Sequence, residues 1–188
     1  TEQCERVFMT SGTTRGDIRG RHYHPALQVY DDSMRRGFQQ FFMPSTERMP
    51  MLMLFPTEDM MPNSSLAHYL ALAMRSFGDA SSAYGIDEGG LNLERVILWL
   101  QSAQAAGKPV AVLGASYSWV HLMDALQARG MTFALPPGSR FLDTGGFKGQ
   151  SRDIPLPMFY EGLSRTFGVP SHQCVNMYGM TELSTQWY

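Results

Sequence analysis

The chain has 188 residues, of which 44% are hydrophobic and 12% aromatic, so it is long and apolar enough to bury a core as one domain. Fifteen basic and 17 acidic residues give a net charge of −2, which argues against a nucleic-acid partner. No apolar run reaches the roughly 18–20 residues of a membrane span, and two cysteines, Cys4 and Cys174, make no disulfide framework, which favours a cytoplasmic protein.

Short apolar runs and amphipathic segments alternate along the chain. Apolar runs predict strands at 6–10, 51–55, 110–113, 140–144 and 174–178. Apolar residues spaced by three and four predict helices at 25–42, 66–77, 92–106, 118–129 and 157–167. Glycines such as Gly107 follow several of these helices and are suited to end them. The alternation predicts an α/β fold in which a mostly parallel sheet is layered with helices on both faces.

Three loops that contain glycine or hydroxyl groups each follow a predicted strand. They are 10–16, Gly145–Gly146 and 178–182. In sheets of this kind, ligands bind at the carboxyl ends of the strands. We therefore expect the three strands to belong to one sheet and the three loops to converge on one ligand site.

The first loop, Thr10-Ser-Gly-Thr-Thr-Arg-Gly16, is a candidate phosphate site. Its glycines let backbone N–H groups approach phosphate oxygens, and its hydroxyls add donors. It is not a Walker P-loop, because no Gly-Lys-Ser/Thr follows. A polar surface turn is the alternative interpretation.

The last loop, Tyr178-Gly-Met-Thr-Glu182, combines three chemical groups within one turn. A tyrosine ring can stack on a purine, a threonine hydroxyl can bind a phosphate, and a carboxylate is a hard oxygen ligand for Mg²⁺. Together the two motifs predict a nucleotide site.

Both motifs resemble those of the adenylate-forming superfamily, which includes acyl-CoA synthetases, peptide-synthetase adenylation domains and firefly-type luciferases. The first loop is similar to its Ser/Thr-Ser-Gly-Thr-Thr-Gly loop, and Tyr178-Gly-Met-Thr-Glu182 is similar to its Tyr-Gly-x-Thr-Glu turn. Segments 55–66, 145–149 and 178–188 resemble the LuxE-type acyl-protein synthetases within that superfamily.

The resemblance implies a function and a set of site residues. It implies ATP- and Mg²⁺-dependent activation of a carboxylic acid, fatty or other, to an acyl-adenylate, followed by transfer to a thiol of a protein cysteine, coenzyme A or a carrier protein. Thr181 and Glu182 would be catalytic, with Glu182 holding Mg²⁺ and Thr181 bonding the α-phosphate or acyl phosphate. The ATP-binding residues would be Thr10, Ser11, Gly12, Thr13 and Thr14 at the β- and γ-phosphates, and Gly145, Gly146, Tyr178 and Gly179 around adenine.

The resemblance also implies that residues 1–188 form a single domain, the central part of a large N-terminal adenylation domain, with the C-terminal lid absent from this chain. The loop departs from the family pattern at Arg15, which stands where glycine is usual. The usual Pro-Lys is replaced by 17–19, which leaves Arg15, Arg19 and Arg21 as candidate cations for the phosphates.

Two other interpretations stay open. The string Val110-Ala-Val-Leu-Gly-Ala-Ser-Tyr-Ser118 leads from a predicted strand into a predicted helix and resembles the nucleophile elbow of α/β-hydrolases, with Ser118 in place of the last glycine. Ser116 would be the nucleophile, and Asp143 and His172 follow in the order of a Ser–Asp–His triad. The other is a degenerate domain that keeps the fold but only binds a nucleotide or a partner.

Overall fold

The computed structural model describes residues 4–10, 19–44, 48–147 and 149–188. Its centre is a six-stranded sheet in the order β10-β9-β8-β7-β3-β4. Five strands are parallel, and β10 runs antiparallel to β9, which confirms the predicted mostly parallel sheet. The strands are β3 (Met51–Leu54), β4 (Ala83–Tyr84), β7 (Ala111–Ala115), β8 (Arg140–Thr144), β9 (Cys174–Gly179) and β10 (Gln186–Trp187).

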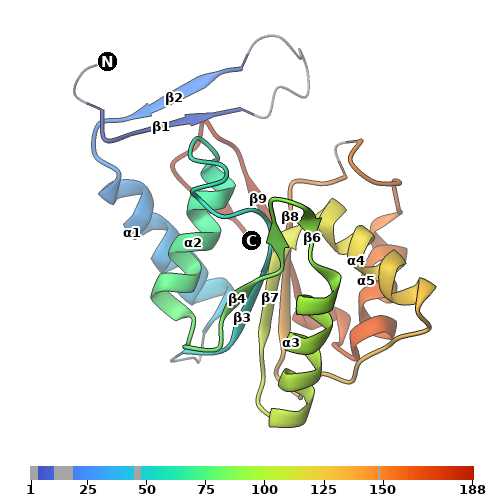
Figure 1. Cartoon of the computed structure of the whole chain (residues 1–188). Helices are drawn as coiled ribbons and strands as arrows, with labels where there is room; N and C mark the ends of the chain where they lie inside the picture. The colour runs from blue at the N-terminus through green and yellow to red at the C-terminus, as the bar shows by residue number, and fades with distance from the viewer. Residues whose placement is uncertain (1–3, 11–18, 45–47, 148) are drawn as a thin grey trace.

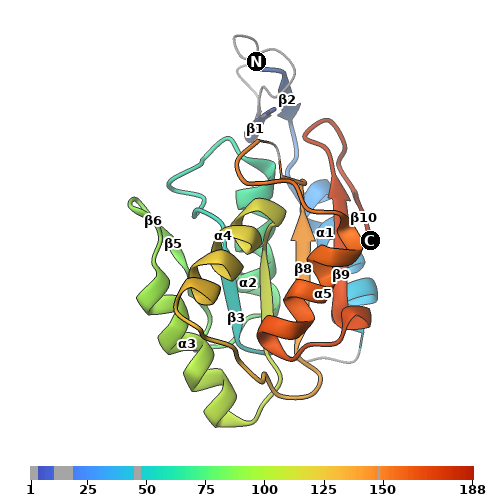
Figure 2. The same ribbon diagram turned by 90° about the vertical axis from the view of Figure 1, so that its right-hand side faces the viewer.

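Helices cover both faces of the sheet (Figure 1 and Figure 2). One layer contains α1 (Gln28–Gly37), the π-helical turn η1 (Phe38–Phe42) and α2 (Ser65–Phe77). The other contains α3 (Leu93–Ala106), α4 (Ser116–Ala128) and α5 (Leu156–Phe167). These helices confirm the five predicted helical segments, with the first continued by η1. None of the helices in the described part of the chain is long and apolar enough to cross a membrane.

The central strands face two apolar cores. In β3, Met51 and Met53 pack into the core beneath α1 and α2, while Leu52 and Leu54 pack into the core beneath α3, α4 and α5. All four side chains are fully buried. A strand covered on both faces has no polar alternation, which explains the continuous apolar run in the sequence.

Local sequence sets the helix boundaries. The Ser64 side chain accepts a hydrogen bond from the Ala67 N–H at 3.2 Å, and the Asn92 side chain accepts one from the Arg95 N–H at 3.1 Å, as N-cap residues do. Gly107 follows α3 with φ 66°, a left-handed conformation that suits glycine and ends the helix.

Two small hairpins lie outside the main sheet. One is formed by β5 (Ile86–Asp87) and β6 (Gly90–Leu91), and the other by β1 (Arg6–Met9) and β2 (Arg21–His24). The hairpin β1–β2 lies beyond the carboxyl ends of the sheet strands (Figure 1 and Figure 2). The expectation that β1 belongs to the sheet is therefore wrong. Only Phe8 of this strand is buried, so β1 lacks the two apolar faces of a central parallel strand.

Candidate functional site

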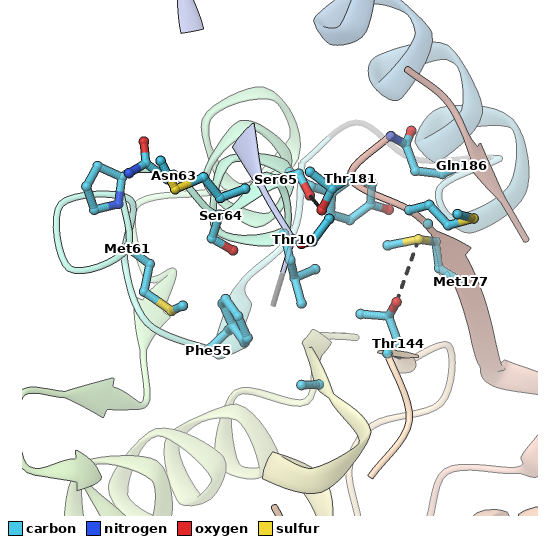
Figure 3. Close-up of a pocket in the computed structure, with 18 of the residues that line it drawn as sticks. Thr10, Phe55, Met61, Asn63, Ser64, Ser65, Thr144, Met177, Thr181 and Gln186 are labelled. Atoms are coloured by element: carbon cyan, nitrogen blue, oxygen red, sulfur yellow. Dashed lines mark hydrogen bonds between the residues drawn. The ribbon is translucent and has the colours of Figure 1, made fainter. Parts of the chain in front are cut away.

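A pocket of about 510 Å³ opens where the carboxyl ends of the sheet strands face the hairpin β1–β2 (Figure 3). Its volume is typical of a small-molecule site. Ala115 ends β7, Thr144 ends β8, Met177 and Gly179 belong to β9, and all four line the pocket. The remaining wall comes from the hairpin, from the segment after β3, from the loop after β8, from the turn between β9 and β10, and from α1, α2, α4 and β10.

The hairpin brings Thr10 to the pocket although β1 lies outside the sheet. The Thr10 N–H donates to the Gly20 carbonyl at 2.9 Å, and the Gly20 N–H donates to Thr10 Oγ1 at 2.9 Å. The Met9 N–H donates to the Asn63 carbonyl at 2.8 Å, which joins the hairpin to the segment before α2. Thr10, which follows β1, and Arg19, which lies shortly before β2, both line the pocket.

An ion-pair network holds the base of the same hairpin against the helices. Glu58, whose side chain is 19% exposed, binds Arg6 of β1 at 2.7 Å and Arg75 of α2 at 2.6 Å. It also contacts His68 Nδ1, and His68 Nε2 lies 2.8 Å from Asp31 Oδ1 of α1. Burial opposes ionisation of Glu58, but the hydrogen bonds from Arg75 and His68 outweigh it and lower its pKa. The network fixes the hairpin relative to α1 and α2.

The loop after β8 contributes Thr144 and Gly145. Thr144 Oγ1 lies 3.8 Å from Met177 Sδ, which joins the ends of β8 and β9. Gly145 and Gly146 have φ angles of 77° and 64°, in the region that side chains with a Cβ rarely adopt. Both glycines are therefore required by the turn itself. Gly145 lines the pocket, and Gly146 follows it on the exposed side of the turn.

The end of β9 contributes Gly179, and the turn between β9 and β10 contributes Thr181. Thr181 Oγ1 lies 3.5 Å from Ser65 Oγ, the first residue of α2 (Figure 3). Gln186 pairs with Gly179 in the sheet and also lines the pocket. This wall therefore offers hydroxyl, amide and backbone groups beside the side chains of Met177 and Met180.

The other predicted site residues are placed as follows. The Tyr178 side chain is 57% exposed, and it precedes Gly179 without lining the pocket. Glu182 is exposed and follows Thr181. Ser11, Gly12, Thr13 and Thr14 lie outside the described residues. The structure thus brings Thr10, Gly145, Gly179 and Thr181 together around one space.

Two helices begin at this pocket. Ser64, Ser65 and Leu66 at the start of α2 line it, as do Ala115 and Tyr117 at the start of α4. The first N–H groups of a helix lack intrahelical partners and carry the positive end of its dipole. Both helices have 13 residues, so the pocket has two positive poles that suit an anionic ligand.

The structure does not assemble a hydrolase triad. Ser116 is 3% exposed, and its Oγ donates to Asp143 Oδ2 at 3.0 Å or to the Thr144 carbonyl at 3.1 Å. His172 lies before Cys174, the first residue of β9, at the opposite edge of the sheet from Ser116. Ser116 therefore meets the predicted aspartate but has no imidazole from His172 to take its proton.

Asp143 instead joins three elements behind the pocket. Besides the Ser116 hydroxyl of α4, it accepts hydrogen bonds at 3.0 Å from the Tyr160 hydroxyl of α5 and the Asn176 amide of β9. Asp143 is 2% exposed, and burial raises its pKa although these hydrogen bonds oppose the rise. Burial, assisted by the Asp143 charge, also raises the pKa of Cys174 to about 12, so this thiol is a poor nucleophile.

Sequence reasoning missed much of the pocket wall. Asn63, Ser64 and Ser65 belong to segment 55–66, for which the sequence predicts no binding role, although a loop after a parallel strand is a place where ligands bind. Tyr30 and Tyr69 line the pocket from α1 and α2. They occupy apolar-stripe positions of those helices, where the sequence signal for a core residue and for a site residue is the same.

A comparison with models of known protein families found no match. A comparison with the sequences of curated proteins also found none. The similarity to known proteins is therefore structural.

Several solved structures share this fold at low sequence identity. One is 2-hydroxyisobutyryl-CoA ligase in complex with 2-HIB-AMP and CoA, with a TM-score of 0.57 and 15% identity. The matched region covers 98% of this chain and 38% of that chain. Another is o-succinylbenzoate-CoA synthetase from Bacillus subtilis with a product analogue (TM-score 0.56, 15% identity, 97% and 31%). The same synthetase with ATP and a magnesium ion gives a TM-score of 0.54 at 17% identity, with 96% and 31% covered.

These similarities confirm the α/β fold with its mostly parallel, helix-covered sheet. The chain spans about a third of the length of the ligases that it matches, 31% and 38% for the two proteins named. At such identities the match is one of fold alone, and a shared fold does not fix the activity.

Proposed function

We propose that this chain is part of an AMP-forming ligase, which activates a carboxylic acid with ATP to an acyl-adenylate and then transfers the acyl group to a thiol. The observation that carries the proposal is the convergence of Thr10, Gly145, Gly179 and Thr181 on one pocket. These residues come from the three loops in which the sequence predicts nucleotide binding. The fold shared with CoA ligases supports the same function.

The proposed first step is the attack of a carboxylate oxygen on the α-phosphorus of ATP. The new bond joins that oxygen to phosphorus, and the bond from the α-phosphorus to the departing pyrophosphate breaks. No general base is needed, because a carboxylate is already ionised. The chain has to position the reactants and stabilise the phosphate charge. The hydroxyls of Ser65 and Thr181, 3.5 Å apart at the start of α2, are suited to donate to phosphate oxygens.

Within the same proposal, Glu182 holds Mg²⁺ and Tyr178 stacks on adenine. No group of three or more Asp, Glu, His or Cys suited to a metal occurs among the described residues. An exposed carboxylate beside the pocket nevertheless fits Mg²⁺, which proteins often bind through one or two carboxylates together with substrate phosphates. When bound, Mg²⁺ would neutralise phosphate charge.

The acyl group would lie against the apolar part of the wall. Phe55, Met60, Met61 and Pro62 follow β3 and line the pocket, and flexible methionines accommodate varied apolar shapes. The thiol acceptor is a protein cysteine, coenzyme A or a carrier protein, and the LuxE-type resemblance favours a protein cysteine. Cys174 is a poor acceptor because of its raised pKa. The cytoplasmic setting belongs to the same proposal.

Calorimetric titration of the protein with AMP and with a non-hydrolysable acyl-adenylate mimic tests the site. We expect saturable binding that Thr181→Val weakens about tenfold, the effect of losing roughly one hydrogen bond to a charged group. Tyr178→Ala is expected to weaken AMP binding by about 1–3 kcal/mol, as for other base-stacking residues.

Thr185→Val is the matched control, because Thr185 is exposed and bonds Ser33 rather than the pocket. Equal losses in both threonine variants would contradict the role of Thr181. A folded wild-type protein that binds neither ligand would overturn the proposal and favour a domain that keeps the fold and binds a partner.

A further inference from the structure

Arg19 is the one charged side chain among the described residues that line the pocket. The other polar lining groups in that part of the chain are hydroxyls and amides, such as Thr10, Asn63, Gln150 and Gln186. A ligand with a cationic group would find no carboxylate among them. A ligand with an anionic group would find Arg19, whose planar guanidinium can bind a phosphate or carboxylate through two hydrogen bonds.

Backbone contacts hold Arg19 at this place. It lies beside Gly20, which exchanges two hydrogen bonds with Thr10, each of 2.9 Å. A Cβ on Gly20 would lie 3.2 Å from Thr10 Cγ2, so the two residues are in close contact. The bond from Met9 to Asn63 then ties this end of the hairpin to the pocket wall.

Two acidic residues near the base of the hairpin, Glu58 and Asp31, are already bound to cations. Glu58 pairs with Arg6 and Arg75, and Asp31 pairs with Arg35 and contacts His68. The charge of these two residues is thus balanced locally, and Glu182, the exposed carboxylate beside the pocket, is not among the lining residues. The starts of α2 and α4 add positive poles to the same pocket.

We propose that Arg19 determines the charge selectivity of the pocket, so that an anionic ligand binds in preference to a neutral ligand of the same shape. The inference rests on the proposed function for the identity of the ligand, and it assigns a residue that lies outside the recognised motifs. Of the three arginines considered from the sequence, Arg15 lies outside the described residues. Arg21 pairs with Met9 in the hairpin and is not among the lining residues.

The test compares matched ligands rather than single affinities. AMP and adenosine differ by a phosphate, and octanoate carries a carboxylate where octanamide carries a neutral amide. Each of these four ligands is titrated calorimetrically into the wild type and into Arg19→Gln, Arg19→Lys and Arg21→Gln. We expect the wild type to bind the anionic member at least tenfold more tightly in one or both pairs. Arg19→Gln should lower the affinity for that anion about tenfold and change the affinity for its neutral counterpart less than twofold. Arg19→Lys should restore part of the preference for the anion.

The ratio of the two affinities within a pair is informative, because a general loosening of the hairpin would lower the affinity for both ligands together. Arg21→Gln removes the same charge from the same hairpin and should keep the wild-type ratio. An unchanged ratio in Arg19→Gln overturns this inference, and if Thr181→Val still weakens AMP, the proposed function stands without it. A wild type that binds none of the four ligands overturns both.

Discussion

Gly114 is a single residue whose requirement is steric. It lies in β7 opposite Leu54 of β3, and a Cβ built on it would stand 2.7 Å from Leu54 Cβ and 2.8 Å from the Leu54 carbonyl oxygen. Backbone atoms of a central strand cannot move aside cheaply. Gly114 therefore allows the close approach of two central strands just below the pocket.

We expect Gly114→Ala to lower the free energy of unfolding by about 2–3 kcal/mol, the upper part of the range for overpacked cores. Urea unfolding followed by circular dichroism measures this. Gly89→Ala is the control, because a Cβ there meets only Asp87 Oδ1 at 3.4 Å. It should change stability by less than about 0.5 kcal/mol. Equal effects of the two substitutions would show that the approach of β7 to β3 is not constrained.

The same residues explain why the sequence resembles a nucleophile elbow. Close packing of β7 against β3 requires a glycine at position 114, and the hydroxyl of Ser116 donates a hydrogen bond to buried Asp143. Both contacts join residues far apart in the sequence. The local Gly-x-Ser pattern therefore looks the same whether the serine has a structural or a catalytic role. Only the position of His172 relative to the strands decides between the two, and that depends on the direction of β9.

At the scale of elements, the hairpin β1–β2 depends on Glu58. This carboxylate joins β1 to α2 through Arg6 and Arg75. Its pKa is lowered in the folded protein by hydrogen bonds that outweigh the effect of burial. A lowered pKa means that the ionised form is favoured by folding. The contribution to stability is therefore present above the ordinary glutamate value of about 4.5 and is lost as the pH falls through the lower folded value.

Glu58→Gln should therefore lower stability at pH 7 by about 1–3 kcal/mol, and its difference from wild type should shrink as the pH falls below about 4.5. Urea unfolding at several pH values between 7 and 3 measures the two curves. Glu88→Gln, which changes an exposed carboxylate between β5 and β6, should follow the wild type throughout. Parallel curves for wild type and Glu58→Gln would contradict the assigned role.

Sequence periodicity predicted the helices and the central strands because each has a local signature. The apolar stripe of α2, its N-cap Ser64 and the apolar run of β3 are examples. The membership of β1 in the sheet was predicted wrongly, since pairing partners are not encoded locally. Short strands such as β4 and β10, with two residues each, carry too few residues for a periodic signal.

At the scale of the whole molecule, the pocket joins segments far apart in the chain. Thr10 and Arg19 come from the first 20 residues of the sequence, Ser65 and Thr144 lie further along it, and Thr181 lies near its end. Three loops were predicted to converge because the carboxyl ends of parallel strands share one edge. The contributions of Tyr30 and Tyr69 depended on how α1 and α2 pack, which the sequence does not specify.

Because the ligand would contact all these segments, its binding should stabilise the whole fold. At an AMP concentration 100 times the dissociation constant, the expected gain is about 2.7 kcal/mol. For a chain of this length that raises Tm by about 5–10 °C. Thermal unfolding at increasing AMP concentration measures the shift, and Thr181→Val at the same concentrations should show a smaller one. A constant Tm would contradict binding at a site built from the folded structure.

The position of β9 and β10 in the sheet has a consequence for synthesis. A ribosome releases residues 9–19, together with the hairpin, before residues 177–186. The wall formed by Gly179, Thr181 and Gln186 is absent until β9 pairs with β8. A nascent chain can therefore collapse part of its methionine-rich core before β9 and β10 emerge, while the ability to hold a ligand arises only once these two strands have docked.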